Sequence, residues 1–183
     1  MVLRYVPILK AKPGELTAVM HTRRRIADRI RPLFEIIRLA DGILRPKYLA
    51  TSPTPTLTYL DRTAASIVRS WGTRAAMVDG YYWPPDALTE SGEHVIAYML
   101  RQLRNAGLPI VPVVGYDRWE NAVYRAGMMG VGFASEPVSC LRLDSQAIED
   151  SAEPEFFCDN VTSILDGLDL FPERCQVLLV DRL

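Results

Sequence analysis

The sequence predicts an α/β fold with a parallel sheet, and a (β/α)8 TIM-barrel-like arrangement with about six β/α units present fits it better than an open doubly wound sheet. Six short apolar runs alternate with helical patterns along the chain. The 183 residues are 49% hydrophobic and 23% charged, as in a globular domain. The turn after the first run, KAKPGEL, holds one glycine where a dinucleotide-binding fold needs three, which favours the barrel.

The predicted strands are short, apolar and partly β-branched, which is typical of strands buried on both faces. They are Tyr5–Lys10, Arg31–Ile37, Ala75–Tyr82, Pro109–Tyr116, Ser139–Leu143 and Gln176–Asp181. Because strands that alternate with helices are joined by right-handed crossovers, all of them are expected to run parallel. Within the fifth strand, Cys140 and Arg142 are two residues apart and are therefore expected to share a face.

Amphipathic patterns between these strands predict helices with apolar stripes in residues 16–30, 55–71, 95–103, 119–126 and 156–168. Proline is favoured at the first position of a helix, and Pro55 is expected there. Glycine is favoured just beyond a helix, and Gly72 and Gly107 are expected to end the second and third helices.

The last predicted strand lies in QVLLVDRL, with no covering helix after it. An apolar edge strand tends to pair with other chains unless something covers it. We therefore expect residues 1–183 to form a single barrel-like domain that is shortened at its carboxyl end. Either two further β/α units or a partner would complete it.

Every predicted strand carries an ionisable residue toward its carboxyl end or, as with Asp117 after the fourth strand, directly beyond it, on the face where parallel barrels hold their sites. The predicted catalytic cluster is Lys10, Glu35, Asp79, Arg142 and Asp181. Lys10 and Arg142 suit the phosphate or carboxylate of an anionic or zwitterionic ligand. The three carboxylates could instead hold a divalent cation. The competing interpretation is structural ion pairing, for example between Glu35 and Lys10.

Aromatic residues follow the third predicted strand in the segment DGYYWPPD. Tyr81, Tyr82 and Trp83 would lie on the same face as the ionisable residues, stiffened by two prolines. Aromatic side chains there can anchor a partner protein or stack on a ring. Packing over the rim of the barrel is the alternative.

Composition and charge argue against several kinds of partner. A net charge of −1 gives the chain no electrostatic reason to bind nucleic acid, and the arginines of HTRRRIADRIR are interleaved with Asp28, as on a solvated helix face. No window approaches the roughly 18 apolar residues of a membrane helix. His21 and His94 lack metal-ligand spacing, so no metal site is predicted from them, and no motif identifies a cofactor. Three cysteines without a close pair, and no leader peptide, favour the cytoplasm.

The opening segment YVPILKAKPGE is similar to the start of the phage T4 beta-protein family. The likeness continues in order through RPLFEII, AAMVDGYY, AGLPIVPVVGY, VSCLRLD and LFPERCQVLLVDRL. This resemblance implies a barrel-like fold in a chain shorter than typical members. It also implies a setting in phages, prophages and bacterial mobile elements, in a family whose biochemical activity is not established.

Two classes of function stay open, and the first is the preferred prediction. The first is a protein of phage–host conflict that works by binding another protein, or a second copy of itself, through the last strand. The resemblance and the exposed sheet edge favour it. The second is a barrel enzyme that acts on an anionic small molecule, which the charges at the strand ends favour. The sequence does not decide whether the protein is an enzyme.

Overall fold

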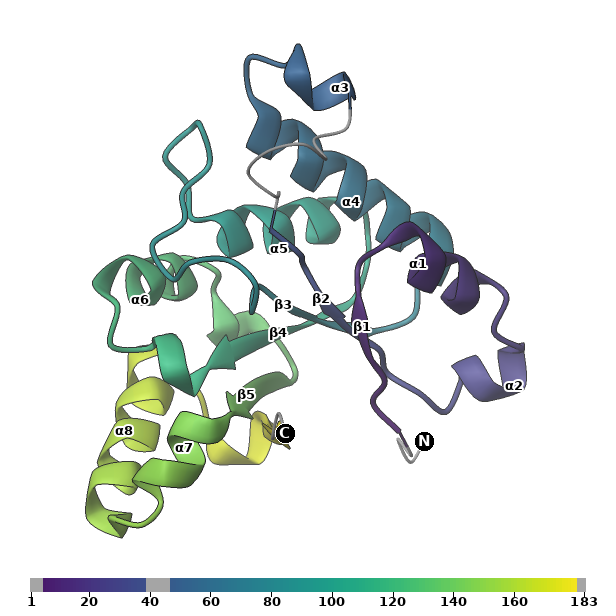
Figure 1. Cartoon of the computed structure of the whole chain (residues 1–183). Coiled ribbons are helices and arrows are strands. Elements are labelled where there is room, and N and C mark those ends of the chain that lie inside the picture. The colour runs from purple at the N-terminus through teal and green to yellow at the C-terminus, as the bar shows by residue number, and fades with distance from the viewer. Residues whose placement is uncertain (1–4, 39–46, 181–183) are drawn as a thin grey trace.

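The computed structural model of the chain describes residues 5–38 and 47–180 (Figure 1). Within them, parallel strands form one six-stranded sheet in sequential order. The strands are β1 (Ile8–Lys10), β2 (Leu33–Glu35), β3 (Ala76–Asp79), β4 (Ile110–Gly115), β5 (Ser139–Leu143) and β6 (Cys175–Leu179). The parallel α/β prediction is confirmed, and each strand lies within or overlaps its predicted range.

The sheet curls into a half-barrel, with its helices on the convex side (Figure 1). Arg31, just before β2, donates a hydrogen bond from Nη1 to Oε1 of Gln176 on β6 at 3.1 Å. Three strands separate β2 from β6 in the sheet, so this contact requires strong curvature. The described sheet is an open half-barrel, and its identity as part of a TIM barrel stays a prediction.

The helices connect consecutive strands. They are α1 (Pro13–Met20), α2 (Arg24–Ala27), α3 (Lys47–Ala50), α4 (Pro55–Trp71), α5 (Val95–Asn105), α6 (Ala122–Met129), α7 (Ser145–Asp150) and α8 (Pro154–Gly167), with short 3-10 turns η1 (Tyr116–Arg118), η2 (Phe133–Ser135) and η3 (Pro172–Arg174). Pro55 begins α4 as predicted. Gly72 and Gly107 follow α4 and α5 with φ angles of +72° and +77°, which glycine adopts without strain.

Two helical predictions differ from the structure. The single helix predicted from residues 16–30 is two helices, α1 and α2. Thr17 and Thr22 turn their hydroxyls onto carbonyls four residues earlier, a bond by which threonine weakens a continuous helix. The apolar patterns also do not predict α3 or α7, which are too short to show a stripe. Asp144 caps α7 by accepting a bond from the Ala147 N–H at 3.4 Å.

Apolar side chains fill both faces of the sheet. The convex face packs on the helices through residues such as Phe34, Val78 and Leu141. The concave face carries a second, smaller cluster composed of Leu33, Met77, Val111, Val113 and Cys140. Burial on both faces explains why the strands are almost continuously apolar. A charged side chain on the concave face is therefore surrounded by apolar neighbours and needs a specific explanation.

Strand β6 is less covered than the others. Val177 and Leu179 on it are 62% and 61% exposed, and Phe171 just before it is 58% exposed. Within the described residues, β6 pairs with β5 on one side and forms an edge of the sheet on the other. The predicted exposed apolar edge is therefore present.

Candidate functional site

Strand register brings the predicted strand-end residues together. Lys10 pairs with Glu35, and Glu35 pairs with Asp79, across β1, β2 and β3. Arg142 lies on β5 opposite Gly115 at the end of β4. These side chains belong to the concave face at the carboxyl ends of the strands. The fifth predicted residue, Asp181, lies outside the described residues.

A buried ionic cluster occupies this end of the half-barrel, formed by Glu35, Asp79, Arg118 and Arg142. The Nη1 atom of Arg142 donates to Oε1 of Glu35 at 2.8 Å and to Oδ2 of Asp79 at 2.6 Å. Nη2 of Arg118 donates to the other oxygen of Asp79, Oδ1, at 2.9 Å. Asp79 therefore bridges the two guanidinium groups. All four side chains are at most 6% exposed.

Arg118 is a member of this cluster that the sequence interpretation did not include. It lies in η1, directly after β4, and its Nε also donates to Oδ1 of Asp117 at 3.2 Å. Gly115 makes room for it, because a Cβ at that position would collide with the guanidinium of Arg118. The signal was present in the sequence: Arg118 follows a predicted strand by two residues, but lies past its end, in a turn whose direction the pattern does not reveal.

Two tyrosines cover the cluster. The ring of Tyr81 lies 4.1 Å from the guanidinium carbon of Arg142 and 5.9 Å from that of Arg118. Tyr82 meets Tyr81 edge to face, with ring centroids 5.5 Å apart. Lys10 points its Nζ at the Tyr82 ring, 5.2 Å from the centroid. Cation–π contacts of this kind hold the cations and the rings together.

The third aromatic residue of that segment lies elsewhere. Trp83 packs against the hydrophobic core, with its ring 6.5 Å from that of Tyr59. The structure thus separates Trp83 from the tyrosines that cover the cluster. A role of Tyr81, Tyr82 and Trp83 in binding a partner stays a prediction.

Electrostatics keep both arginines charged. Burial opposes the charge of Arg142, but Asp79 and Glu35 outweigh it, and the net effect raises the pKa of Arg142. Burial likewise opposes the charge of Arg118, while Asp79 and Asp117 raise its pKa overall. Neither guanidinium can act as a proton donor at neutral pH. What the cluster can do is hold two oriented cations in a water-poor site, ready to bind negative charge.

Cys140 lies on the same concave face as Arg142, two residues closer to the amino end of β5, as predicted from their spacing. Its side chain is fully buried, and burial raises the pKa of its thiol to about 12. The thiolate is the nucleophilic form of cysteine, so Cys140 is not a nucleophile at neutral pH.

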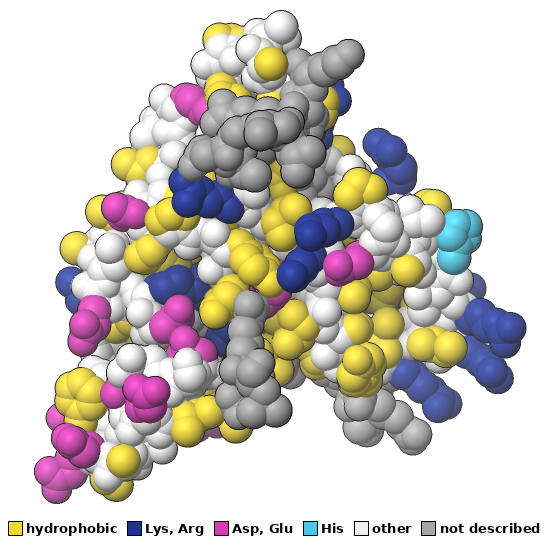
Figure 2. Space-filling view, viewed as in Figure 1, with side chains coloured by type: hydrophobic (Ala, Val, Ile, Leu, Met, Phe, Trp, Pro, Cys, Tyr) yellow, Lys and Arg dark blue, Asp and Glu magenta, His cyan; other side chains and the backbone are white. Residues whose placement is uncertain are grey.

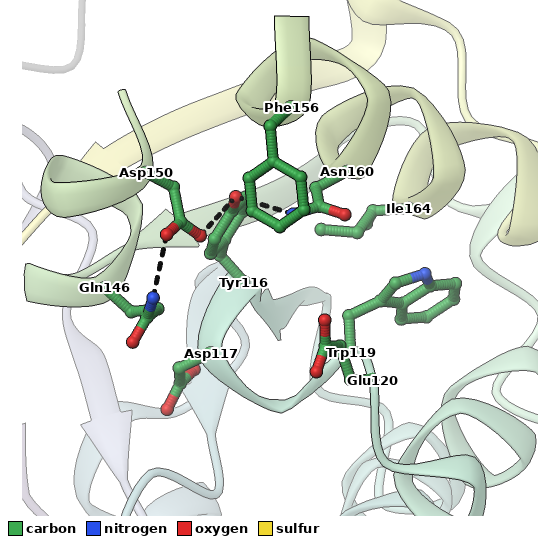
Figure 3. A pocket seen from close by; sticks show the side chains of 9 residues that line it. All are labelled: Tyr116, Asp117, Trp119, Glu120, Gln146, Asp150, Phe156, Asn160 and Ile164. Carbon is green, nitrogen blue, oxygen red and sulfur yellow. Dashed lines mark hydrogen bonds between the residues drawn. The ribbon is translucent and has the colours of Figure 1, made fainter. Parts of the chain in front are cut away.

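A cavity of about 250 Å³ opens beside the cluster, between η1, α7 and α8 (Figure 3). Its lining includes the aromatic side chains of Tyr116, Trp119 and Phe156 and the carboxylates of Asp117, Glu120 and Asp150. The hydroxyl of Tyr116 donates to Asp150 at 2.9 Å and accepts from Asn160 at 3.0 Å. The sequence interpretation named only Asp117 here, because it did not predict α7.

This cavity is acidic. Burial raises the pKa of Asp117, since its carboxylate is poorly hydrated there. Acidic side chains also gather on the surface over α7 and α8, whereas basic side chains gather around α1 and α2 (Figure 2). An anion would therefore be repelled from the cavity, and the buried ionic cluster is the better place for one.

The described part of the chain shows neither a metal-type cluster nor a membrane-spanning helix. No three histidine, cysteine, aspartate or glutamate side chains within residues 5–38 and 47–180 gather as metal ligands would. None of the helices described is both long and apolar enough to cross a membrane.

Comparison with known proteins identifies the family. No curated protein and no solved structure matches the chain. The family model described as Beta protein matches residues 5–182, which include the whole described sheet and the buried ionic cluster. This match confirms the resemblance seen in the opening segment. The chain belongs to the Beta protein family.

Proposed function

We propose that this protein binds a small anionic molecule at the carboxyl ends of its strands and acts on it as barrel enzymes do. The observation that carries the proposal is the buried ionic cluster itself. Four charged side chains from β2, β3, β5 and η1 converge on one point while being at most 6% exposed.

Stability alone is a weak reason to bury these charges. Taking an ion out of water costs several kcal/mol, and well-packed apolar residues in place of a buried ion pair are often as stable or more so. The concave face below the cluster is already apolar, so an apolar layer would fit the same position. Buried, oriented charges at the carboxyl ends of parallel strands are instead typical of ligand and catalytic sites.

Each residue has a role in this proposal. Arg142 and Lys10 attract and hold the anion, and Arg118 adds positive charge from the opposite side of Asp79. Glu35 and Asp79 fix the guanidinium of Arg142 in place. Tyr81 and Tyr82 form the cover that keeps water away from the bound molecule.

Native mass spectrometry of the protein purified gently from its own host tests this proposal. We expect a monomer that carries a small anionic ligand. In Lys10→Ala the ligand should be lost, because the half-buried ammonium beside the cover is gone. The matched control is Lys12→Ala, which removes an exposed lysine two residues away. A wild-type protein without ligand, or equal retention in both variants, would contradict the proposal.

The exposed apolar side chains of β6 support a second candidate function. We propose as the alternative that the protein associates with a second copy of itself through this strand, in the phage–host setting that the family resemblance implies. The supporting observation is that Val177 and Leu179 are more than 60% exposed on an edge strand. Unpaired strand edges with apolar side chains are ready to pair with another chain.

Light scattering after size-exclusion chromatography tests self-association. We expect a concentration-dependent dimer that Val177→Asp with Leu179→Asp converts to a monomer. The control is Met129→Asp, which introduces the same charge at a 56% exposed apolar residue on α6. A wild-type monomer at all concentrations would rule this alternative out.

A further inference from the structure

Among the described residues, Arg142 makes hydrogen bonds through only one of its three guanidinium nitrogens. Nη1 makes both of its hydrogen bonds, to Glu35 and Asp79. Nε and Nη2 have no acceptor in the part of the chain that the structure describes, although both atoms are buried. The whole residue is 1% exposed. A large, fully charged side chain is therefore buried with two donor nitrogens unused.

Such donors are costly. A buried donor without an acceptor costs roughly 1–3 kcal/mol, and more when it carries charge. Unsatisfied groups of this kind in native proteins call for an explanation, such as a water molecule, an ion or a functional role. Nε and Nη2 lie on the same edge of the planar guanidinium, and their N–H bonds point in parallel. That edge matches the two oxygens of a carboxylate or phosphate.

We propose that the Nε–Nη2 edge of Arg142 is a preformed subsite for a carboxylate or phosphate group, bound through two oxygens. This inference rests on the proposed function, because it names the group of the anionic ligand that the cluster would bind. The guanidinium is held in place, since two carboxylates bind its Nη1 end.

The local charge permits an anion here. Three carboxylates of Glu35, Asp79 and Asp117 are balanced by the three cations of Arg118, Arg142 and Lys10. Among these described side chains, negative charge therefore does not exceed positive charge, in contrast to the acidic cavity next to the cluster. Because the edge has no contact with solvent, the ligand must displace part of its cover. Tyr81, whose ring lies against this guanidinium, and Tyr82 beside it are half-buried in the turn after β3, and we expect them to move.

Nuclear magnetic resonance of arginine Nε–H groups in the full chain tests the subsite directly. The probes are inorganic phosphate and acetate, each titrated at constant ionic strength against chloride. We expect the Arg142 signal to move downfield in a saturable manner with at least one probe, and comparison of the two identifies the preferred group. The Arg101 signal is the internal control, because its Nε is already bonded to Glu93 at 3.1 Å.

The Arg142 signal is assigned by its absence from Arg142→Lys. If that variant does not fold, Tyr81→Ala identifies the same signal, because it removes the ring current of an aromatic group 4.1 Å away. An Arg142 signal that moves with neither probe would overturn the subsite. If a natural ligand is nevertheless lost in Lys10→Ala, the proposed function stands and only the subsite fails; if there is no natural ligand either, both fail.

Discussion

Arg142→Met removes a guanidinium that is bonded to two buried carboxylates, and we expect it to lower the free energy of unfolding by about 3–5 kcal/mol. The pairs it breaks are short, at 2.8 Å and 2.6 Å, and the three side chains are at most 2% exposed. Methionine keeps the unbranched stem of the side chain, so the loss reports mainly on the charge.

The assay is denaturant unfolding followed by circular dichroism, with thermal unfolding as a second measurement. For a chain of this size, 1 kcal/mol corresponds to about 2–4 °C in Tm. The expected loss therefore lowers Tm by roughly 6–20 °C. It should appear at every salt concentration, since ions do not screen a buried pair well.

Arg101→Met is the matched control. Arg101 binds Glu93 at 2.6 Å, the same distance as the shorter pair of Arg142, and it also lies over a tyrosine ring, that of Tyr98, at 4.9 Å. Its side chain is 48% exposed, so water screens the pair and we expect a loss of about 1 kcal/mol or less. Equal losses in the two variants would refute the argument that burial makes the Arg142 cluster different.

Three further predictions concern single groups. Gly115→Ala should lower the free energy of unfolding by about 1–3 kcal/mol in denaturant titrations, because the new Cβ collides with the guanidinium of Arg118 in the ionic cluster. Burial lowers the pKa of His94 below 6.5, so the unfolded state binds its proton more readily. The contribution of neutral His94 to the free energy of unfolding should be fully present above about pH 6.5 and decrease as the pH drops below that value. His94→Gln should lessen this decrease. In thiol labelling at pH 8, exposed Cys158 should react at once, whereas Cys140, with a pKa of about 12, should react only on unfolding.

Each of these predictions has a control or a contrary result. Gly130→Ala should be nearly neutral, since the nearest atom to its new Cβ is 3.4 Å away; equal effects at both glycines would contradict the collision. An identical pH dependence in wild type and His94→Gln would exclude His94 as its source. Labelling of Cys140 in the native protein as fast as that of Cys158 would show that the concave face is open to solvent.

Local patterns predicted most of the secondary structure. Short apolar runs located the six described strands, because burial on both faces leaves a continuous signature, and their alternation with helices predicted that they run parallel. Pro55 and Gly72 located the ends of α4, since they act on the backbone of their own residues. The opening segment YVPILKAKPGE was enough to suggest the family, which the match over residues 5–182 confirms. The short helix α7 left no such pattern, and the cavity that it lines was missed with it.

The candidate site was predictable in its position but not in its contacts. Parallel strands bring their carboxyl ends to one edge, which is why Lys10, Glu35, Asp79 and Arg142 could be grouped from the sequence. Only the folded chain decides their partners: Glu35 lies 107 residues from Arg142 along the chain, and Arg118 enters from a turn. The sequence by itself determined that Lys10, Glu35, Asp79 and Arg142 reach that edge, because the carboxyl ends of parallel strands lie there whatever their partners are, but it did not place Arg118. The tertiary structure decided which of them are buried, paired or left with unused donors, because curvature and side-chain packing set those distances.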